Sequence, residues 1–345
     1  MSADVTRRLP IGAELVEGGA HFRVWAPRRK RVAVVSGDQA TELTAERDGY
    51  FAGLVNGARA GFRYKLRVDE SGAYPDPASR WQPDGPHGDS VVVDPAAFKW
   101  TDTGWQGLTD RGQIIYELHI GTLTPDGTYR AAAEQLGELA GLGVTAVEVM
   151  PLAEFPGSFG WGYDGVDFFA PYHGYGTPDD FRAFVDRAHA EGLGVILDVV
   201  YNHFGPDGNY LGEFSDAYIS RRHKTEWGEA LNFDGERCQG VREFVLSNVR
   251  HWIAEYHLDG LRLDATHSIY DDSSPHILAE VGEAARDVAR EGGAARGVTV
   301  VAENEPQDPR IARRRDRGGY ALDGLWCDDF HHAAMVAAGG KREAY

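Results

Sequence analysis

The 345-residue sequence has little of several features that mark particular classes of protein. It contains only two cysteines, Cys238 and Cys327, which are too few for a disulfide framework and lack the spacing of a metal site. We therefore expect both to be reduced packing residues in a cytoplasmic protein. No apolar run approaches the roughly 18 residues of a membrane helix. The first residues, "MSADVTRRLP", also lack the apolar core of a signal peptide.

Basic residues are scarce as well: 35 Lys and Arg face 53 Asp and Glu, which gives a formal net charge of −18. This balance argues against nucleic acid and anionic membranes as partners and suits a soluble enzyme with a neutral substrate. The sequence has no P-loop, no H-E-x-x-H and no G-x-S-x-G, and no G-x-G-x-x-G follows its first α/β strand. We expect no cofactor. Eight Trp and 15 Tyr residues supply flat faces that can stack on sugars or simply fill the interior.

Two patterns divide the chain, and we expect an N-terminal domain at 1–98 and a catalytic domain at 99–345. Residues 10–98 contain short β-branched and aromatic runs between Gly, Asp and Asn turns, which predicts a small antiparallel sandwich. From residue 113, strands alternate with helices, which predicts a parallel α/β sheet. The predicted strands are 113–120, 144–150, 193–200, 258–265, 297–303 and 322–329, and the predicted helices are 131–141, 178–192, 241–256 and 275–291.

Polar residues end one predicted strand after another, and these residues are His119, Glu148, Asp198, Asp264 and Glu303. The active sites of (β/α)8 barrels are built at that face, so we favour a TIM-type barrel over a doubly wound sheet. The sequence supplies only six strands, whereas a closed barrel needs eight. An open arc of six strands would expose two apolar edges, which natural proteins avoid. We therefore expect the sequence to be a fragment or a truncated gene product that lacks the last two strands.

The stretch "GLRLDA" combines an apolar strand with two charged residues. Alternation places Leu261 and Leu263 on one face, and Arg262 and Asp264 on the other. The guanidinium would favour the ionised form of the neighbouring carboxylate. An ionised, oriented carboxylate is what a glycosidase nucleophile must be, although a structural ion pair would produce the same pattern.

Glu303, at the end of "GVTVVAENEP", is the candidate for a second carboxylate that would act as the general acid. A general acid must hold a proton, so we expect Glu303 in a less charge-compensated site than Asp264. Glu305 lies two residues further on and is the alternative, but Pro306 indicates that the strand has already ended there.

Two loops add candidates for sugar binding. "DVVYNH" places Asp198, Asn202 and His203 at the end of a strand, where each could bond to sugar hydroxyls. "WGYDG" places Trp161 and Tyr163 on a loop above the sheet, where aromatic rings suit stacking on a pyranose. A structural histidine and ordinary loop packing are the plainer interpretations of these residues.

Taken together, these segments resemble the α-amylase family, glycoside hydrolase family thirteen. "DVVYNH" resembles the first conserved region of that family, "GLRLDATH" the second, and the glutamate of "VVAENE" the third. The resemblance implies a (β/α)8 barrel with accessory β-domains and a retaining mechanism with the two carboxyl groups roughly 5–5.5 Å apart. The implied roles are Asp264 as nucleophile, Glu303 as acid/base, Arg262 as aid to the nucleophile, and Asp198, Tyr163 and His203 as sugar ligands, with His267 and Trp161 grouped among the substrate-binding residues.

Within the family, one subgroup matches most of the chain, in segments such as "YPDPASRWQPDGPHG", "IIYELHIGTLTPDGTY" and "HSIYDDSSPHILAEV". That resemblance implies a maltooligosaccharide-type substrate with a terminal trehalose, whose neighbouring α-1,4 bond is hydrolysed. It also implies that residues 10–98 form an immunoglobulin-like sandwich. The position of Asn202 often ligates calcium in α-amylases, but no further set of oxygen ligands is evident here, and we expect no metal.

Three other interpretations stay open. A glycogen branching enzyme shares the domains and the intermediate, although "PDPASRWQPDG" and "HSIYDD" argue against it. The others are a non-catalytic glucan-binding protein and a structural barrel of unrelated function. The fourth conserved region of the family, with its histidine and third carboxylate, would follow a seventh strand. Nothing up to Tyr345 carries it, so we expect little or no activity from the 345 residues alone.

Overall fold

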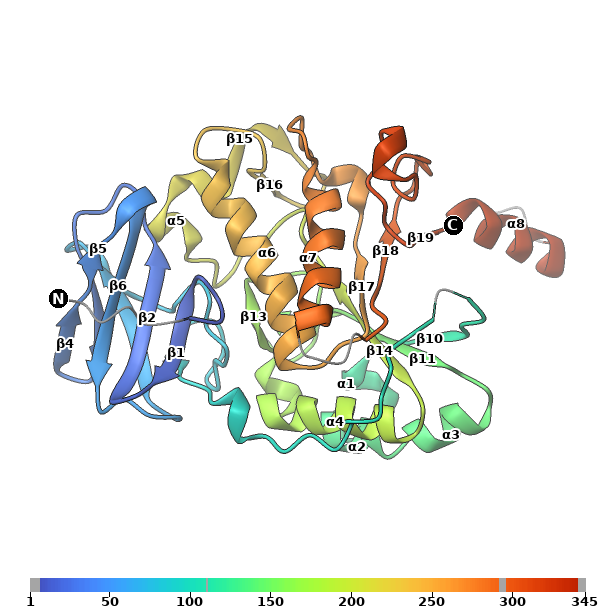
Figure 1. The fold of residues 1–345 in the computed structure, drawn as a ribbon, viewed down its shortest axis with the longest axis horizontal. Coiled ribbons are helices and arrows are strands. Elements are labelled where there is room, and N and C mark those ends of the chain that lie inside the picture. The colour runs from blue at the N-terminus through green and yellow to red at the C-terminus, as the bar shows by residue number, and fades with distance from the viewer. Residues whose placement is uncertain (1–6, 110, 292–295, 341–345) are drawn as a thin grey trace.

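A computed structural model of the protein describes residues 7–109, 111–291 and 296–340. Two sheets at the N-terminal end stand beside a region of alternating strands and helices (Figure 1). Within the described ranges, no helix combines the length and hydropathy that crossing a bilayer requires.

The N-terminal region is the predicted sandwich of antiparallel strands. One sheet has the order β1-β2-β6-β5 and the other the order β4-β3-β7-β8, with β9 paired to β7. The ring of Phe22 in the first sheet meets that of Tyr64 in the second, edge to face at 4.8 Å, so aromatic residues join the two layers. The strands are β1 (Gly12–Val16), β2 (Gly19–Trp25), β3 (Val32–Ser36), β4 (Gln39–Glu42), β5 (Thr44–Ala45), β6 (Tyr50–Asn56), β7 (Arg63–Val68), β8 (Gly72–Tyr74) and β9 (Ser90–Val91).

The second region contains a six-stranded sheet in which every pairing is parallel, in the order β10-β11-β14-β17-β18-β19. Neighbouring strands in this sheet follow one another in chain order, and within the described residues only the strands of two short hairpins come between them in the sequence. The sheet makes up part of a TIM-type barrel, as predicted. The strands are β10 (Ile115–Leu118), β11 (Ala146–Val149), β14 (Gly194–Val199), β17 (Gly260–Leu263), β18 (Thr299–Glu303) and β19 (Gly324–Trp326).

Helices connect and cover these strands, and α6 and α7 pack side by side against the sheet (Figure 1). Every residue of β11, β14 and β17 is buried, as expected of parallel strands covered on both faces. The helices are α1 (Ile120–Leu123), α2 (Tyr129–Ala133), α3 (Leu136–Gly141), α4 (Pro178–Ala190), α5 (Leu211–Phe214), α6 (Cys238–Glu255), α7 (Ile277–Glu291) and α8 (Asp328–Gly339).

The two long loops contain short hairpins that the sequence did not predict. One hairpin pairs β12 (Ala153–Glu154) with β13 (Asp167–Pro171), and the other pairs β15 (Ile219–Lys224) with β16 (Glu229–Leu231). Two-stranded elements of this size depend on packing against the barrel, so local sequence carries only a weak signal for them. Helix α8 was also missed.

The sequence-based expectations need two small corrections. His119 does not belong to a strand, since β10 ends before it and His119 is the N-cap of α1. Cys238 is buried at the start of α6, as predicted, whereas Cys327 is exposed and so is not a packing residue. Cys327 lies in the short connection between β19 and α8.

A buried ion cluster joins the N-terminal region to the barrel. The guanidinium of Arg80 lies 3.2 Å from Glu255, at the end of α6, and 3.5 Å from Glu14 of β1. All three side chains are buried, so removal of one charge would leave an uncompensated partner away from water. The cluster therefore ties the first sheet of the sandwich to a helix of the barrel.

Candidate active site

The C-terminal ends of neighbouring strands bring the predicted charged residues together. The register pairs Asp198 of β14 with Arg262 of β17, and it pairs Arg262 with Val301 of β18, two residues before Glu303. Glu148 comes from β11 on the other side of β14. Side chains that point the same way at one end of parallel strands must converge, and here they converge on Arg262.

Arg262 is the centre of the arrangement. Its Nη1 lies 2.9 and 3.0 Å from the two carboxylate oxygens of Asp198 and 2.8 Å from Oδ1 of Asp264. Its Nη2 lies 3.1 Å from Glu303, and its Nε lies 3.9 Å from Glu148. Burial disfavours the charged guanidinium, but the surrounding carboxylates outweigh that effect and raise the pKa of Arg262 above its usual value. Arg262 therefore stays cationic.

Asp198 is oriented from two sides. Arg262 binds both of its oxygens, and the hydroxyl of Tyr163 donates to Oδ2 at 2.8 Å. Burial raises the pKa of Asp198, against the opposing effect of Arg262, and burial also raises the pKa of Tyr163. The loop residue Tyr163 is thus bonded to the end of β14.

Asp264 receives two different donors. Arg262 donates to Oδ1, and the Asn202 amide donates to Oδ2 at 2.9 Å and to the backbone carbonyl of Asp264 at 3.0 Å. Each carboxylate oxygen has a second lone pair, so these bonds orient Asp264 without using all of its acceptor capacity. Asn202 therefore positions Asp264, whereas the sequence suggested a direct contact with sugar.

The carboxylate of Glu303 has two partners in the structure. Besides Arg262, it accepts a hydrogen bond at 2.8 Å from the backbone N–H of Ala265, a residue with φ of 40°. That left-handed conformation is uncommon for alanine. It occurs at the residue that directly follows Asp264 and whose backbone N–H binds Glu303. The same guanidinium contacts both carboxylates, but it hydrogen-bonds Asp264 at 2.8 Å and lies 3.1 Å from Glu303, whose side chain is the more exposed of the two. The alternative, Glu305, is exposed.

Two histidines lie beside this centre. His203 contacts the side-chain oxygen of Asn202 through Nδ1, and burial lowers the pKa of His203. Nδ1 of His267 is buried and has no hydrogen-bond partner among the described residues. Both rings flank the indole of Trp227, with centroid distances of 6.1 Å to His203 and 6.3 Å to His267.

Trp227 is a residue that the sequence did not single out. It lies between β15 and β16, and 51% of its surface is exposed, so an aromatic face is available next to the two histidines. Its only local signal was an aromatic residue beside a glycine in a long loop, which is common. Trp161, which was singled out, is 72% exposed and lies 6.2 Å from the ring of His119.

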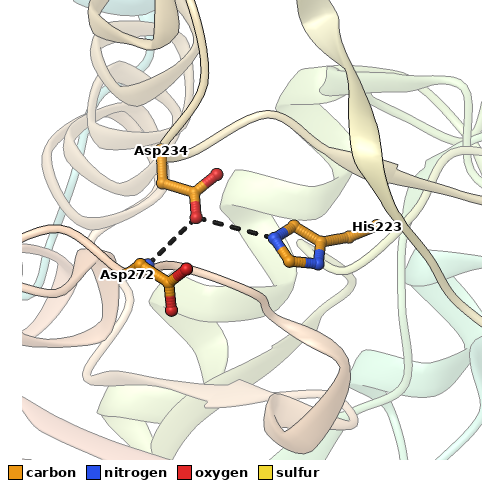
Figure 2. Close-up of side chains that lie close together, drawn as sticks. All are labelled: His223, Asp234 and Asp272. Atoms are coloured by element: carbon orange, nitrogen blue, oxygen red, sulfur yellow. Dashed lines mark hydrogen bonds and ion pairs between the residues drawn. The ribbon is translucent and has the colours of Figure 1, made fainter.

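One cluster outside this centre has the residue types of a metal site. His223, Asp234 and Asp272 each offer one ligand atom, and these atoms lie within 4.8 Å of one another (Figure 2). It is the one such group of three or more found among the described residues. Asn202, the position considered for calcium, faces Asp264 instead.

Comparison with known proteins gives consistent matches. The family model "Alpha amylase, catalytic domain" matches residues 92–229. Malto-oligosyltrehalose trehalohydrolase of Rhizobium sp. strain M-11 is 44% identical over 96% of the chain, and that of Saccharolobus solfataricus is 42% identical over 98%. The chain spans 56% and 58% of the lengths of these two relatives.

A solved structure shows the same arrangement of the backbone. A 1.4 Å crystal structure of a protein from Salmonella typhimurium, described as an alpha amylase, is 40% identical in sequence and superposes with a TM-score of 0.89. The match covers 98% of the present chain and 57% of the other.

Glu148 is expected to make stability depend on pH. Burial raises the pKa of Glu148 from its ordinary value of 4.5 to about 7. Between these two values the folded state holds a proton that the unfolded state has lost, so this contribution to stability falls as pH rises. Replacement of Glu148 by Gln removes the titration. The unfolding free energy of Glu148→Gln should therefore gain on the order of 3 kcal/mol relative to the wild type between about pH 5 and about pH 8. Urea denaturation of both proteins at the two pH values measures the gap, and a gap independent of pH would contradict the assignment.

Proposed function

Because the chain belongs to the α-amylase family of glycoside hydrolases, we propose that it acts on maltooligosaccharides that end in trehalose. It hydrolyses the α-1,4 bond beside the terminal trehalose and releases free trehalose. The observation that carries the proposal is the single guanidinium of Arg262, which holds Asp264 and Glu303 at adjacent strand ends. The curated relatives named above support the choice of substrate.

The chemistry follows from the two carboxylates. Asp264 attacks the anomeric carbon while Glu303 gives its proton to the glycosidic oxygen, so the trehalose leaves and a glycosyl–Asp264 ester forms. Glu303, now ionised, takes a proton from water, and that water attacks the same carbon and releases Asp264. Two displacements at one carbon retain the configuration of the sugar.

The surrounding residues have supporting tasks in this proposal. Arg262 and Asn202 hold the carboxylate of Asp264 in the orientation needed for attack. In this proposal Asp198, which accepts a hydrogen bond from Tyr163, and His203 bind hydroxyl groups of the sugar at the cleaved bond. The indole of Trp227 offers a stacking face beside His203 and His267.

The direct test is trehalose release by the gene product at its natural length. Incubation with a trehalose-capped maltooligosaccharide should release trehalose, and Glu303→Gln should lower the rate by roughly 10²–10⁴-fold, the usual contribution of a general acid. Glu305→Gln is the matched control, since Glu305 is exposed two residues away, and it should leave the rate unchanged. No trehalose, together with a shift of the iodine stain of amylose, would instead indicate a branching enzyme.

Trp227 and Trp161 allow a test of which aromatic residue contacts the substrate. Loss of one stacking contact costs on the order of 1.4 kcal/mol, so Trp227→Ala should lower kcat/KM about tenfold. Trp227→Phe should keep most of the activity, because it retains an aromatic face. Trp161→Ala, assayed in parallel on the same substrate, should have the smaller effect, and the reverse order would refute the placement of Trp227 at the site.

A further inference from the structure

We propose that His223, Asp234 and Asp272 form a binding site for a divalent transition-metal ion of the Zn²⁺ type. The three residues come from separate segments: His223 from β15, Asp234 from the connection between β16 and α6, and Asp272 from the connection between β17 and α7. Their side chains face one another (Figure 2). This site is independent of the proposed hydrolase activity.

The geometry already resembles a partial coordination shell. Nε2 of His223 lies 3.6 Å from Oδ2 of Asp234, and the backbone N–H of Asp272 donates to the same oxygen at 3.1 Å. Ligand atoms bound to one tetrahedral Zn²⁺ at about 2.0–2.1 Å lie roughly 3.4 Å apart. The pairs that are more widely separated can close by movement of Asp272, whose side chain is 74% exposed.

Two polar atoms at the cluster lack the partners that buried polar atoms normally have. Asp234 has a side chain only 3% exposed, yet its Oδ1 has no hydrogen-bond partner among the described residues. Nε2 of His223 is buried and also has no hydrogen-bond partner there. Such orphaned groups are costly and call for an explanation, and a bound cation would use both.

The imidazole determines the class of ion. Mg²⁺ and Ca²⁺ prefer oxygen ligands throughout, whereas one histidine nitrogen with two carboxylates suits Zn²⁺. The ring of His223 stacks on Tyr270 with centroids 4.8 Å apart, which fixes the direction of its nitrogen. Water would complete the coordination.

Arg222 competes with the proposed ion. Its two terminal nitrogens lie 3.1 Å from Asp234 and 2.8 Å from Asp272, so the guanidinium neutralises the same carboxylates. The side chain is 53% exposed and can move into solvent when a metal binds. Because Asp234 is buried, its loss of Arg222 is tolerable only since the bound ion replaces the positive charge beside it. Removal of the Arg222 side chain should therefore strengthen metal binding.

A bound ion would connect three segments near the candidate active site. It would tie the β15–β16 hairpin, which presents Trp227, to the connection that follows the catalytic strand β17. Metal binding should therefore restrain the hairpin and raise the melting temperature of the protein.

The test is titration of the metal-free, untagged chain with Zn²⁺ alone, followed by calorimetry and by thermal unfolding. One equivalent should bind and raise Tm, while Mg²⁺ at the same concentration should not. His223→Asn and Asp234→Asn should each weaken Zn²⁺ binding at least tenfold, and either variant suffices if the other fails to fold. Arg222→Ala should tighten binding, because the competing cation is gone.

Substitution of His331 and His332 by Gln is the matched control. These adjacent histidines lie on α8, which stands apart from β15 (Figure 1), and they could bind Zn²⁺ by themselves. Binding should survive this double substitution. Loss of binding in the control, unchanged binding in both His223→Asn and Asp234→Asn, or weaker binding in Arg222→Ala would each overturn the proposal.

Discussion

The arrangement at the end of the barrel depends on the burial of one guanidinium. Arg262 is 8% exposed, and it reaches carboxylates from β14, from β18 and from its own strand. A buried cation and the buried Asp198 are each too costly alone, but together they satisfy one another. Because strand register places Asp198 opposite Arg262, the geometry of the site is a consequence of the geometry of the sheet.

The same strands supply residues to the core and to the candidate active site. In β17, Leu261 and Leu263 are fully buried in the hydrophobic core, while Arg262 and the following Asp264 face the open end. Hydrogen bonds from Tyr163 to Asp198 and from Asn202 to Asp264 further orient these two carboxylates, which Arg262 also binds. Rigid strands with a supporting layer of donors are the arrangement that catalysis by positioned carboxylates requires.

Sequence alone revealed what short-range patterns encode. Alternation in "GLRLDA" separated Leu261 from Arg262 correctly, because it follows from the period of a strand. Polar residues at predicted strand ends indicated where Asp198, Arg262 and Glu303 converge. Trp227 was missed because the β15–β16 hairpin depends on tertiary packing. The cluster of His223, Asp234 and Asp272 was missed for a similar reason, since its members meet only in the fold. Glu303 was placed correctly, but its contact with Arg262 depends on the pairing of β17 with β18, which no local pattern shows.

The central claim, that Arg262 orients Asp264 as a nucleophile, is tested most directly by trapping the intermediate. In Glu303→Gln of natural length, a maltooligosyl fluoride still forms the ester, since fluoride leaves without a general acid, but hydrolysis of the ester is slow. Mass spectrometry of the digested protein should then find the added sugar on the peptide that contains Asp264. An adduct on another carboxylate, such as Asp198 or Glu148, or no adduct at all, would contradict the account.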